Sequence, residues 1–277
     1  MYSIPLPLTD DDEHYRQTTA RRNSPHRELM AQIAPAVSGA NAAYVAARGR
    51  GAAMVPISAS KEEARALRTA YDLVRSDVGD DSLFATLMTG TRNGQCPMCG
   101  CTQADTLDHY LPRAAFPEFA ILAKNLVPAC WHCNHRKGEQ LAQSGTRRFF
   151  HPYFDVLGAV PVLVADLLVD RVVTVDYRIA EQPGVDEAIT EVLRFHFDQL
   201  GLRDAYRTAA TVELQDRYEA LVQYLGTNKD AAAVRAYLER EARSCRVRRG
   251  ANDWKTALFT AMAEHEEFCP GGLLLLR

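Results

Sequence analysis

Four of the seven cysteines stand in two closely spaced pairs, Cys96 with Cys99 and Cys130 with Cys133. Two residues separate the members of each pair, a spacing at which both thiolates of one arm can bind the same metal ion. Two such arms favour a tetrahedral zinc ion with four sulfur ligands. Because four protein thiolates leave no open coordination position, we expect this zinc to be structural and not catalytic.

The remaining cysteines leave one alternative open. Cys101 could replace Cys99 as a ligand, although the two-residue spacing favours Cys99. A set of four buried thiols without metal is the simpler alternative to a zinc site. Cys245 and Cys269 are isolated in the sequence, and we expect them in the core. An odd number of cysteines with two close pairs favours metal binding over disulfides in a reducing compartment.

Between and after the two arms lie residues that can move protons and bind metals through oxygen. Asp108-His109 is followed by Tyr110-Leu111-Pro112, and Asn125-Leu126 leads into the second arm, after which Asn134-His135-Arg136-Lys137-Gly138 follows directly. In this order the residues resemble the HNH endonuclease family, which has a ββα-metal fold. The resemblance covers about Cys96 to Gly138. A further run, Phe149 to Asp155, resembles a downstream stretch of stand-alone bacterial members.

The resemblance implies a role for each of four residues. His109 would be the general base that deprotonates water, and the ordinary pKa of histidine suits that task near neutral pH. Asp108 and Asn134 would hold one Mg²⁺ or Mn²⁺, distinct from the zinc, as an electrophile at the scissile phosphate. Asn125 would orient the loop that carries His109 through backbone hydrogen bonds.

Three other histidines have competing interpretations. His135 could replace Asn134 as the metal ligand, and we favour Asn134 because it directly follows the last cysteine. His132 lies inside the second arm, where a packing role is favoured over metal ligation. His151 has aromatic neighbours in the sequence, which favours a core position over a catalytic one.

Basic residues gather near the predicted centre and suit phosphate contacts that are independent of base sequence; they are Arg113, Arg136, Lys137, Arg147 and Arg148. The formal net charge of −3 gives no global attraction to nucleic acid, so binding would depend on this local patch. A second basic run at Arg240, Arg243, Arg246, Arg248 and Arg249 is interpreted as a solvated helix end in preference to a nucleic-acid contact.

The sequence therefore predicts a metal-dependent HNH endonuclease that hydrolyses phosphodiester bonds, with DNA as the favoured substrate and RNA as the alternative. A catalytically silent zinc-knuckle protein that binds nucleic acid or protein is the competing interpretation. The sequence also resembles HNH proteins that accompany an ATPase in bacterial anti-phage systems. That resemblance implies an ATPase partner subunit and a defence role.

The expected fold class is α+β and mainly helical, with a small zinc-stapled ββα core between helical regions. We expect a helical region over 1–91, the nuclease core over 92–148 and a mainly helical domain over 149–277. Within the first region, 28–47 is expected to form one helix, and Ser60 and Glu63 form a capping-box pattern before an amphipathic helix. Short strands are expected near 106–110 and 126–129, with a helix starting near Trp131. The valine-rich run 162–179 predicts a hairpin that turns near Asp170.

Composition is that of an ordinary globular protein, with 47% hydrophobic and 24% charged residues. The first twelve residues include three consecutive aspartates and lack the basic and apolar order of a secretory signal. The most apolar stretch, 156–175, is interrupted by charged residues and cannot cross a bilayer as one helix. We expect a cytoplasmic protein without a membrane role.

Overall fold

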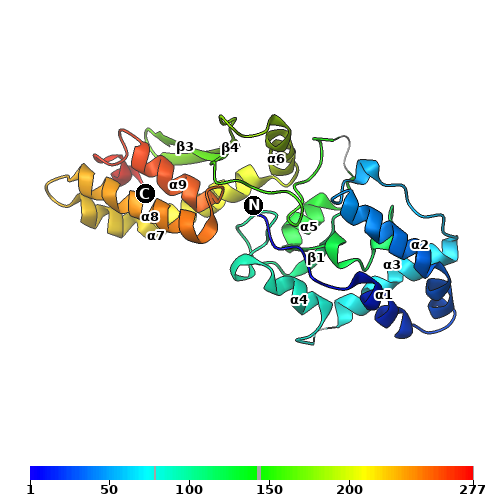
Figure 1. The fold of residues 1–277 in the computed structure, drawn as a ribbon. Helices are drawn as coiled ribbons and strands as arrows, with labels where there is room; N and C mark the ends of the chain where they lie inside the picture. Colours follow the sequence, from blue (N-terminus) through cyan, green and yellow to red (C-terminus); the bar gives the residue numbers. More distant parts are fainter. Residues whose placement is uncertain (78, 142–144, 277) are drawn as a thin grey trace. The chain divides into compact units, whose positions relative to one another are not determined.

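A computed structural model describes residues 1–77, 79–141 and 145–276. The chain divides into two compact units (Figure 1). One unit consists of Ser3–Met98 and Thr102–Val156, and the other of Met1–Tyr2, Cys99–Cys101 and Leu157–Arg277. Residues 142–144, within the expected nuclease core, lie outside the described residues.

The unit built from Ser3–Met98 and Thr102–Val156 begins with four helices: α1 (Asp11–Ala20), α2 (His26–Ala46), α3 (Lys61–Ser76) and α4 (Leu83–Thr89). Short 3₁₀ turns follow α2 and α4, at Gly51–Ala53 (η1) and Arg92–Gly94 (η2). The predicted capping box at the start of α3 is present, because Ser60 accepts the amide of Glu63 and Glu63 accepts the amide of Ser60. The helix expected near 28–47 corresponds to α2, whereas α1 and α4 have no counterpart among the predicted elements.

The predicted order of strand, strand and helix is present after the four helices. Strand β1 (Thr106–His109) pairs antiparallel with β2 (Leu126–Ala129), and α5 (Trp131–Lys137) follows β2 after one residue. The register places His109 opposite Leu126 at one end of the ladder. Two 3₁₀ turns, η3 (Pro117–Phe119) and η4 (Ala123–Asn125), shape the loop between the strands. This ββα element carries both polar motifs of the candidate site.

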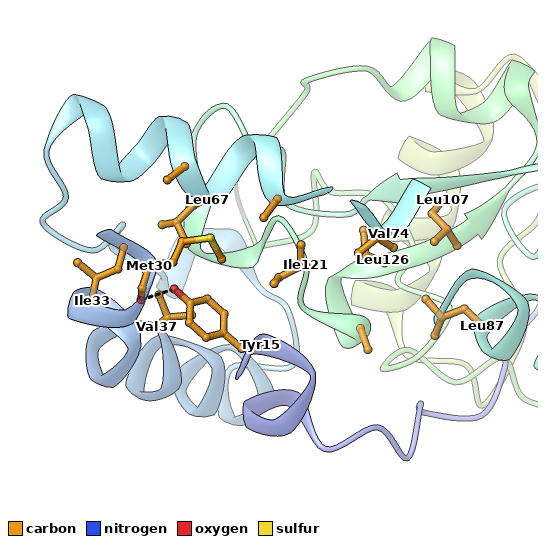
Figure 2. Close-up of a cluster of buried hydrophobic side chains, with 13 residues drawn as sticks. Tyr15, Met30, Ile33, Val37, Leu67, Val74, Leu87, Leu107, Ile121 and Leu126 are labelled. Carbon is orange, nitrogen blue, oxygen red and sulfur yellow. Dashed lines mark hydrogen bonds between the residues drawn. The ribbon is translucent and has the colours of Figure 1, made fainter. Parts of the chain in front are cut away.

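One hydrophobic core joins the helices of this unit to the two strands (Figure 2). Helices α1, α2, α3 and α4 contribute the larger share, and the strands and their loop complete it; the labelled members are Tyr15, Met30, Ile33, Val37, Leu67, Val74, Leu87, Leu107, Ile121 and Leu126. Leu107 and Leu126 belong to β1 and β2. The expected boundary between 1–91 and 92–148 therefore does not separate two cores.

The other unit contains the predicted hairpin and four helices. Strands β3 (Leu163–Val169) and β4 (Val173–Ile179) pair antiparallel around the expected turn at Asp170. The helices are α6 (Glu187–Gln199), α7 (Leu202–Leu225), α8 (Ala231–Arg249) and α9 (Trp254–Glu264), followed by the 3₁₀ turn η5 (Gly272–Leu275). Helix α8 runs to Arg249 and so includes the second basic run. The fold is α+β and mainly helical, as predicted.

No helix in the described part of the chain is both long enough and apolar enough to span a membrane.

Candidate functional site

The four cysteines of the two arms converge in the structure. The Sγ atoms of Cys96, Cys99, Cys130 and Cys133 all lie within 4.8 Å of one another, and all four residues are buried. Four sulfurs around one zinc at ~2.3 Å would be about 3.8 Å apart, so the cluster has the dimensions of a tetrahedral zinc site. All four cysteines are outside disulfide bonds. The donor set and its geometry therefore fit a zinc ion.

Backbone amides support this cluster in the manner expected for thiolate ligands. The Cys133 amide donates to Cys130 Sγ at 3.4 Å, and the Cys101 amide donates to Cys99 Sγ at 3.4 Å. Such donors stabilise negative charge on sulfur. Gly100, between Cys99 and Cys101, has a φ of +65°, a left-handed conformation that glycine adopts readily. Cys101 itself contributes its amide to the cluster and is half-buried.

The polar motif residues border a hollow of about 430 Å³ beside the ββα element. Asp108 and His109 line it from β1, and Asn134 lines it from α5. Further acidic and basic side chains around the same hollow are Asp105, Glu139, Arg75 and Arg113. The structure thus brings Asp108, His109 and Asn134 to one concave surface. A phosphate group has room there.

His109 is fixed from two sides. Its Nε2 lies 2.9 Å from the carbonyl oxygen of Ala120, in the loop between the strands. Its ring meets the Tyr71 ring edge to face, with the centroids 4.4 Å apart. Because a carbonyl oxygen can only accept, Nε2 carries the proton and Nδ1 of the neutral ring is left as an acceptor.

The pKa of His109 favours this neutral form. Burial lowers the pKa of His109 to about 4, and the hydrogen bond to the Ala120 carbonyl opposes that shift only in part. Above that pH the imidazole is therefore unprotonated at one nitrogen. A neutral, oriented imidazole beside a hollow is the form that a general base requires.

Asp108 pairs with a buried lysine. Lys137, from the last turn of α5, places Nζ 3.2 Å from Asp108 Oδ1 and 2.7 Å from the carbonyl oxygen of His109. Asp108 Oδ2 is 3.0 Å from the same nitrogen but outside hydrogen-bond geometry, and it has no hydrogen-bond partner among the described residues. Burial raises the pKa of Asp108, and the charge of Lys137 opposes this shift.

Asn134 supplies a second oxygen to the hollow. Its side-chain nitrogen donates to Thr106 Oγ1 at 3.1 Å, and this assignment leaves the carbonyl oxygen as the group able to bind a cation. Asp108 Oδ2 accepts no hydrogen bond among the described residues although it lies 3.0 Å from Lys137 Nζ, and with Asn134 it makes two oxygen donors at one hollow. Hard divalent cations such as Mg²⁺ and Mn²⁺ prefer such ligands, so the residues fit a cation of this kind.

Asn125 is fully buried and ties together the loop between the strands. Its amide nitrogen donates to the carbonyl oxygens of Leu111 and Phe119, at 3.0 and 3.1 Å, and its oxygen accepts the Leu111 amide at 2.8 Å. Phe119 directly precedes Ala120, whose carbonyl holds His109. The Asn125 side chain therefore acts on the imidazole only through the backbone of Phe119 and Ala120.

His151 extends this network deeper into the unit. The Tyr153 amide donates to His151 Nδ1 at 3.3 Å, so His151 Nε2 carries the proton and donates to Tyr44 Oη at 3.0 Å. The Tyr44 hydroxyl in turn donates to Asn125 Oδ1 at 3.0 Å. Burial lowers the pKa of His151 to about 3. His151 is thus a core histidine, as the sequence favours.

Two of the five basic residues expected at phosphates lie inside the protein. Lys137 is fully buried and committed to Asp108 and to the backbone of His109. Arg148 is buried in a bidentate ion pair with Asp155. A charge in such a pair cannot reach a phosphate without leaving its partner uncompensated. We therefore do not retain Lys137 and Arg148 as nucleic-acid contacts.

The other three basic residues are accessible. Arg136 and Arg147 are exposed, and the half-buried Arg113 lines the hollow. Arg113 also lies over the Tyr71 ring, with its guanidinium carbon 5.2 Å from the ring centroid. His132 is exposed, and the exposed ring of His135 stacks on that of Trp131.

Helices α3 and α4 contribute site residues that the sequence did not indicate. Tyr71 and Arg75 from α3 and Phe84 from α4 line the hollow beside His109. The Tyr71 hydroxyl also donates to the carbonyl oxygen of Leu107 at 3.1 Å. Helical periodicity places Tyr71 near the apolar face of α3, but that pattern alone does not distinguish a core tyrosine from one that packs on a histidine.

These features agree with a comparison against protein families. Residues 96–140 match the model of the HNH endonuclease family. The chain therefore carries an HNH endonuclease domain, with four cysteines placed for a zinc ion. The domain supports a hydrolase of the nuclease type and implies nucleic-acid binding.

One curated relative shares part of the chain. Protein ea31 of Escherichia phage lambda is 43% identical over 63 residues, which amount to 22% of this chain. The match spans about a fifth of the phage protein, 21% of its length. No solved structure matches the chain.

Proposed function

We propose that this protein is a metal-dependent HNH endonuclease that cleaves phosphodiester bonds in DNA. The observation that carries the proposal is the state of His109: a neutral imidazole, fixed through Nε2, beside a hollow that Asp108 and Asn134 also line. Three groups with different chemistry at one concave surface are what phosphodiester hydrolysis needs.

In this proposal Nδ1 of His109 accepts a proton from water as the water attacks phosphorus. The bond between phosphorus and the leaving sugar oxygen breaks, and that oxygen takes up a proton from solvent. The Ala120 carbonyl keeps the ring in the required tautomer, and the Tyr71 ring restricts its rotation. General-base catalysis of this kind contributes roughly 100- to 10,000-fold to a rate. Asn125 acts indirectly, by holding the backbone on either side of the loop that presents Ala120.

Asp108 and Asn134 would hold a divalent cation, which when bound would supply positive charge against the phosphate oxygens and the leaving group. Lys137 adds a fixed positive charge behind Asp108 and orients its carboxylate. His135 is disfavoured as a replacement ligand, since its ring is engaged with Trp131. The four cysteines would hold zinc and take no part in the reaction.

Phosphates on either side of the cut would meet Arg113, Arg136 and Arg147. These contacts carry no sequence information, and they predict binding that weakens as salt rises. Arg113 is the informative member, because it lines the hollow. Replacing Arg113 by glutamine is expected to lower the slope of log affinity against log salt by about one.

A plasmid-cleavage assay tests the proposal. Wild-type protein with Mg²⁺ or Mn²⁺ is expected to cut or nick supercoiled DNA, and His109→Ala is expected to lose at least about 100-fold in rate. His132→Ala is the matched control, since His132 is an exposed histidine in the same domain. Equal rates for wild type and His109→Ala would refute the assignment of His109. Binding of DNA without cutting by any variant would favour a silent zinc-knuckle module.

An ATPase partner and an anti-phage role remain part of the proposal. The support is the length of the segment Leu157–Arg277, which lies outside the HNH match. Against it, the curated relative is itself a phage protein. Affinity purification of the tagged chain from its own host tests the partner: recovery of an ATPase in fixed ratio supports it. Full activity of the isolated chain on ordinary DNA counts against it.

A further inference from the structure

An exposed pair of stacked aromatic rings stands on helix α5. The Trp131 side chain is 62% exposed. Its ring lies parallel to that of His135, with an interplanar angle of 6° and 4.8 Å between centroids. His135 is also exposed. We refer to Trp131 and His135 together as the aromatic platform.

Helix stability gives a weak reason for this platform. An aromatic pair four residues apart on a helix contributes only about 0.2–0.5 kcal/mol. The inward face of α5 is formed by Cys133 and Lys137, which are buried, so Trp131 is not needed to anchor the helix. Large aromatic residues left at a surface are typical of binding sites, because they offer a broad apolar face with little conformational entropy to lose.

The platform adjoins the candidate nuclease site. Asp105 lines the hollow, and its carboxylate accepts the backbone amide of Trp131 at 2.8 Å. Asn134, which also lines the hollow, lies between Trp131 and His135 in the sequence. Arg136, next to His135, is exposed and brings positive charge to the same helix. The platform is therefore linked to the rim of the hollow through Asp105 and through Asn134 of the same helix, and Arg136 adds one positive charge beside it.

We propose that the aromatic platform stacks on an unpaired base of the substrate strand, next to the bond that is cut. This inference rests on the proposed nuclease function and narrows its substrate. A base inside a duplex is covered on both faces by its neighbours, so an aromatic side chain can stack only on a base that is unpaired or at an end. The preferred substrate therefore has unpaired nucleotides beside the cleavage site, as in a single strand, a flap or a bulge.

Binding experiments without cleavage test this directly. In the His109→Ala background, a single-stranded DNA oligonucleotide and the matching blunt duplex are titrated at one salt concentration, and tryptophan fluorescence is followed. The chain has two tryptophans, and Trp254 is buried at 5% exposure, so quenching by a stacked base reports on Trp131. The single strand is expected to quench the fluorescence and to bind more tightly than the duplex.

Variants of the platform complete the test. Trp131→Ala is expected to weaken single-strand binding about 5- to 150-fold, the range for loss of one stacked base, and to leave duplex binding nearly unchanged. Trp131→Phe retains a ring and is expected to keep most of the affinity. Leu8→Ala, at a fully exposed apolar residue of the same unit, is the matched control and should bind like its parent.

The outcomes separate this inference from the proposed function. Equal affinity of Trp131→Ala and its parent for the single strand would overturn the stacking role, and so would a lack of binding to either oligonucleotide. Equal loss for single strand and duplex would also overturn it, because the contact would then be independent of unpaired bases. Trp131-dependent binding of the single strand, with no cutting by the wild-type protein, would support stacking while refuting the nuclease proposal.

Discussion

Lys137 and Asp108 form an ion pair that is closed off from solvent. Their charged atoms are 3.0 Å apart, and the two side chains are 0% and 2% exposed. The same ammonium group also binds the carbonyl oxygen of His109 at 2.7 Å. A single cation from the end of α5 thus fixes both the carboxylate and the backbone of the two neighbouring motif residues.

Removing that cation should be costly. Lys137→Met leaves Asp108 as a buried carboxylate without compensation, and the expected loss in unfolding free energy is about 3–5 kcal/mol. The double variant Asp108→Asn with Lys137→Met should recover most of that loss. Urea unfolding of the zinc-saturated protein measures both. An additive result, with no recovery in the double variant, would show that the pair does not act as a unit.

The cysteine cluster is expected to make folding depend on zinc. One zinc per chain is expected, and its release should coincide with unfolding, because in zinc-binding peptides the metal contributes roughly 10 kcal/mol or more of folding free energy. Cys133→Ser should lower both the zinc content and the melting temperature. Cys101→Ser should retain both, since Cys101 assists only through its backbone amide. Zinc content by metal analysis distinguishes the two, and zinc loss in Cys101→Ser would reassign the ligand set.

Tyr71 should affect the rate of catalysis more than substrate binding. Its ring packs on the imidazole of His109 from a separate helix, so Tyr71→Ala frees the ring of the proposed general base, which must be accurately placed. A fall in kcat of up to about 100-fold with little change in KM is expected. Tyr71→Phe keeps the ring and loses only the bond to Leu107, so it should restore most of the rate. A change in KM alone would place Tyr71 among the binding residues.

His151 should make the protein less stable as pH falls. Its pKa is about 3 in the folded chain and near 6.5 when unfolded. Above pH 6.5 both states are neutral there; below it only the unfolded state takes up a proton. Stability should therefore drop from pH 6.5 downwards, by at most about 1.4 kcal/mol per pH unit from this residue. His151→Asn cannot titrate, so its unfolding free energy should fall less steeply between pH 6.5 and 4.5. An unchanged slope would contradict this assignment.

Local patterns in the sequence predicted the cysteine cluster and several elements of secondary structure. The two-residue spacing within each cysteine pair predicted the cluster, because chelation depends on neighbours in the chain. Ser60 and Glu63 likewise predicted the start of α3, because a capping box is complete within four residues. The hairpin of β3 and β4 followed from its apolar runs and turn.

Contacts between distant segments could not be predicted in the same way. Lys137 and Arg148 were interpreted as phosphate contacts because a basic residue near a motif is most often exposed. The local sequence does not show that each forms a buried ion pair with a carboxylate. Tyr71 was missed for a related reason. Its partner Leu107 is 36 positions away, and only the packing of α3 on β1 brings them together.

The shared apolar core limits how this chain can be subdivided. A fragment cut at 96 and 140 would keep the whole HNH match yet expose Leu107, Ile121 and Leu126, whose neighbours lie in the four preceding helices. Such a fragment would lack most of the side chains that cover the apolar residues of its sheet, so we expect it to aggregate. Grafting the proposed nuclease activity onto another protein would therefore require transferring the preceding helices as well, because they complete the core around the motif.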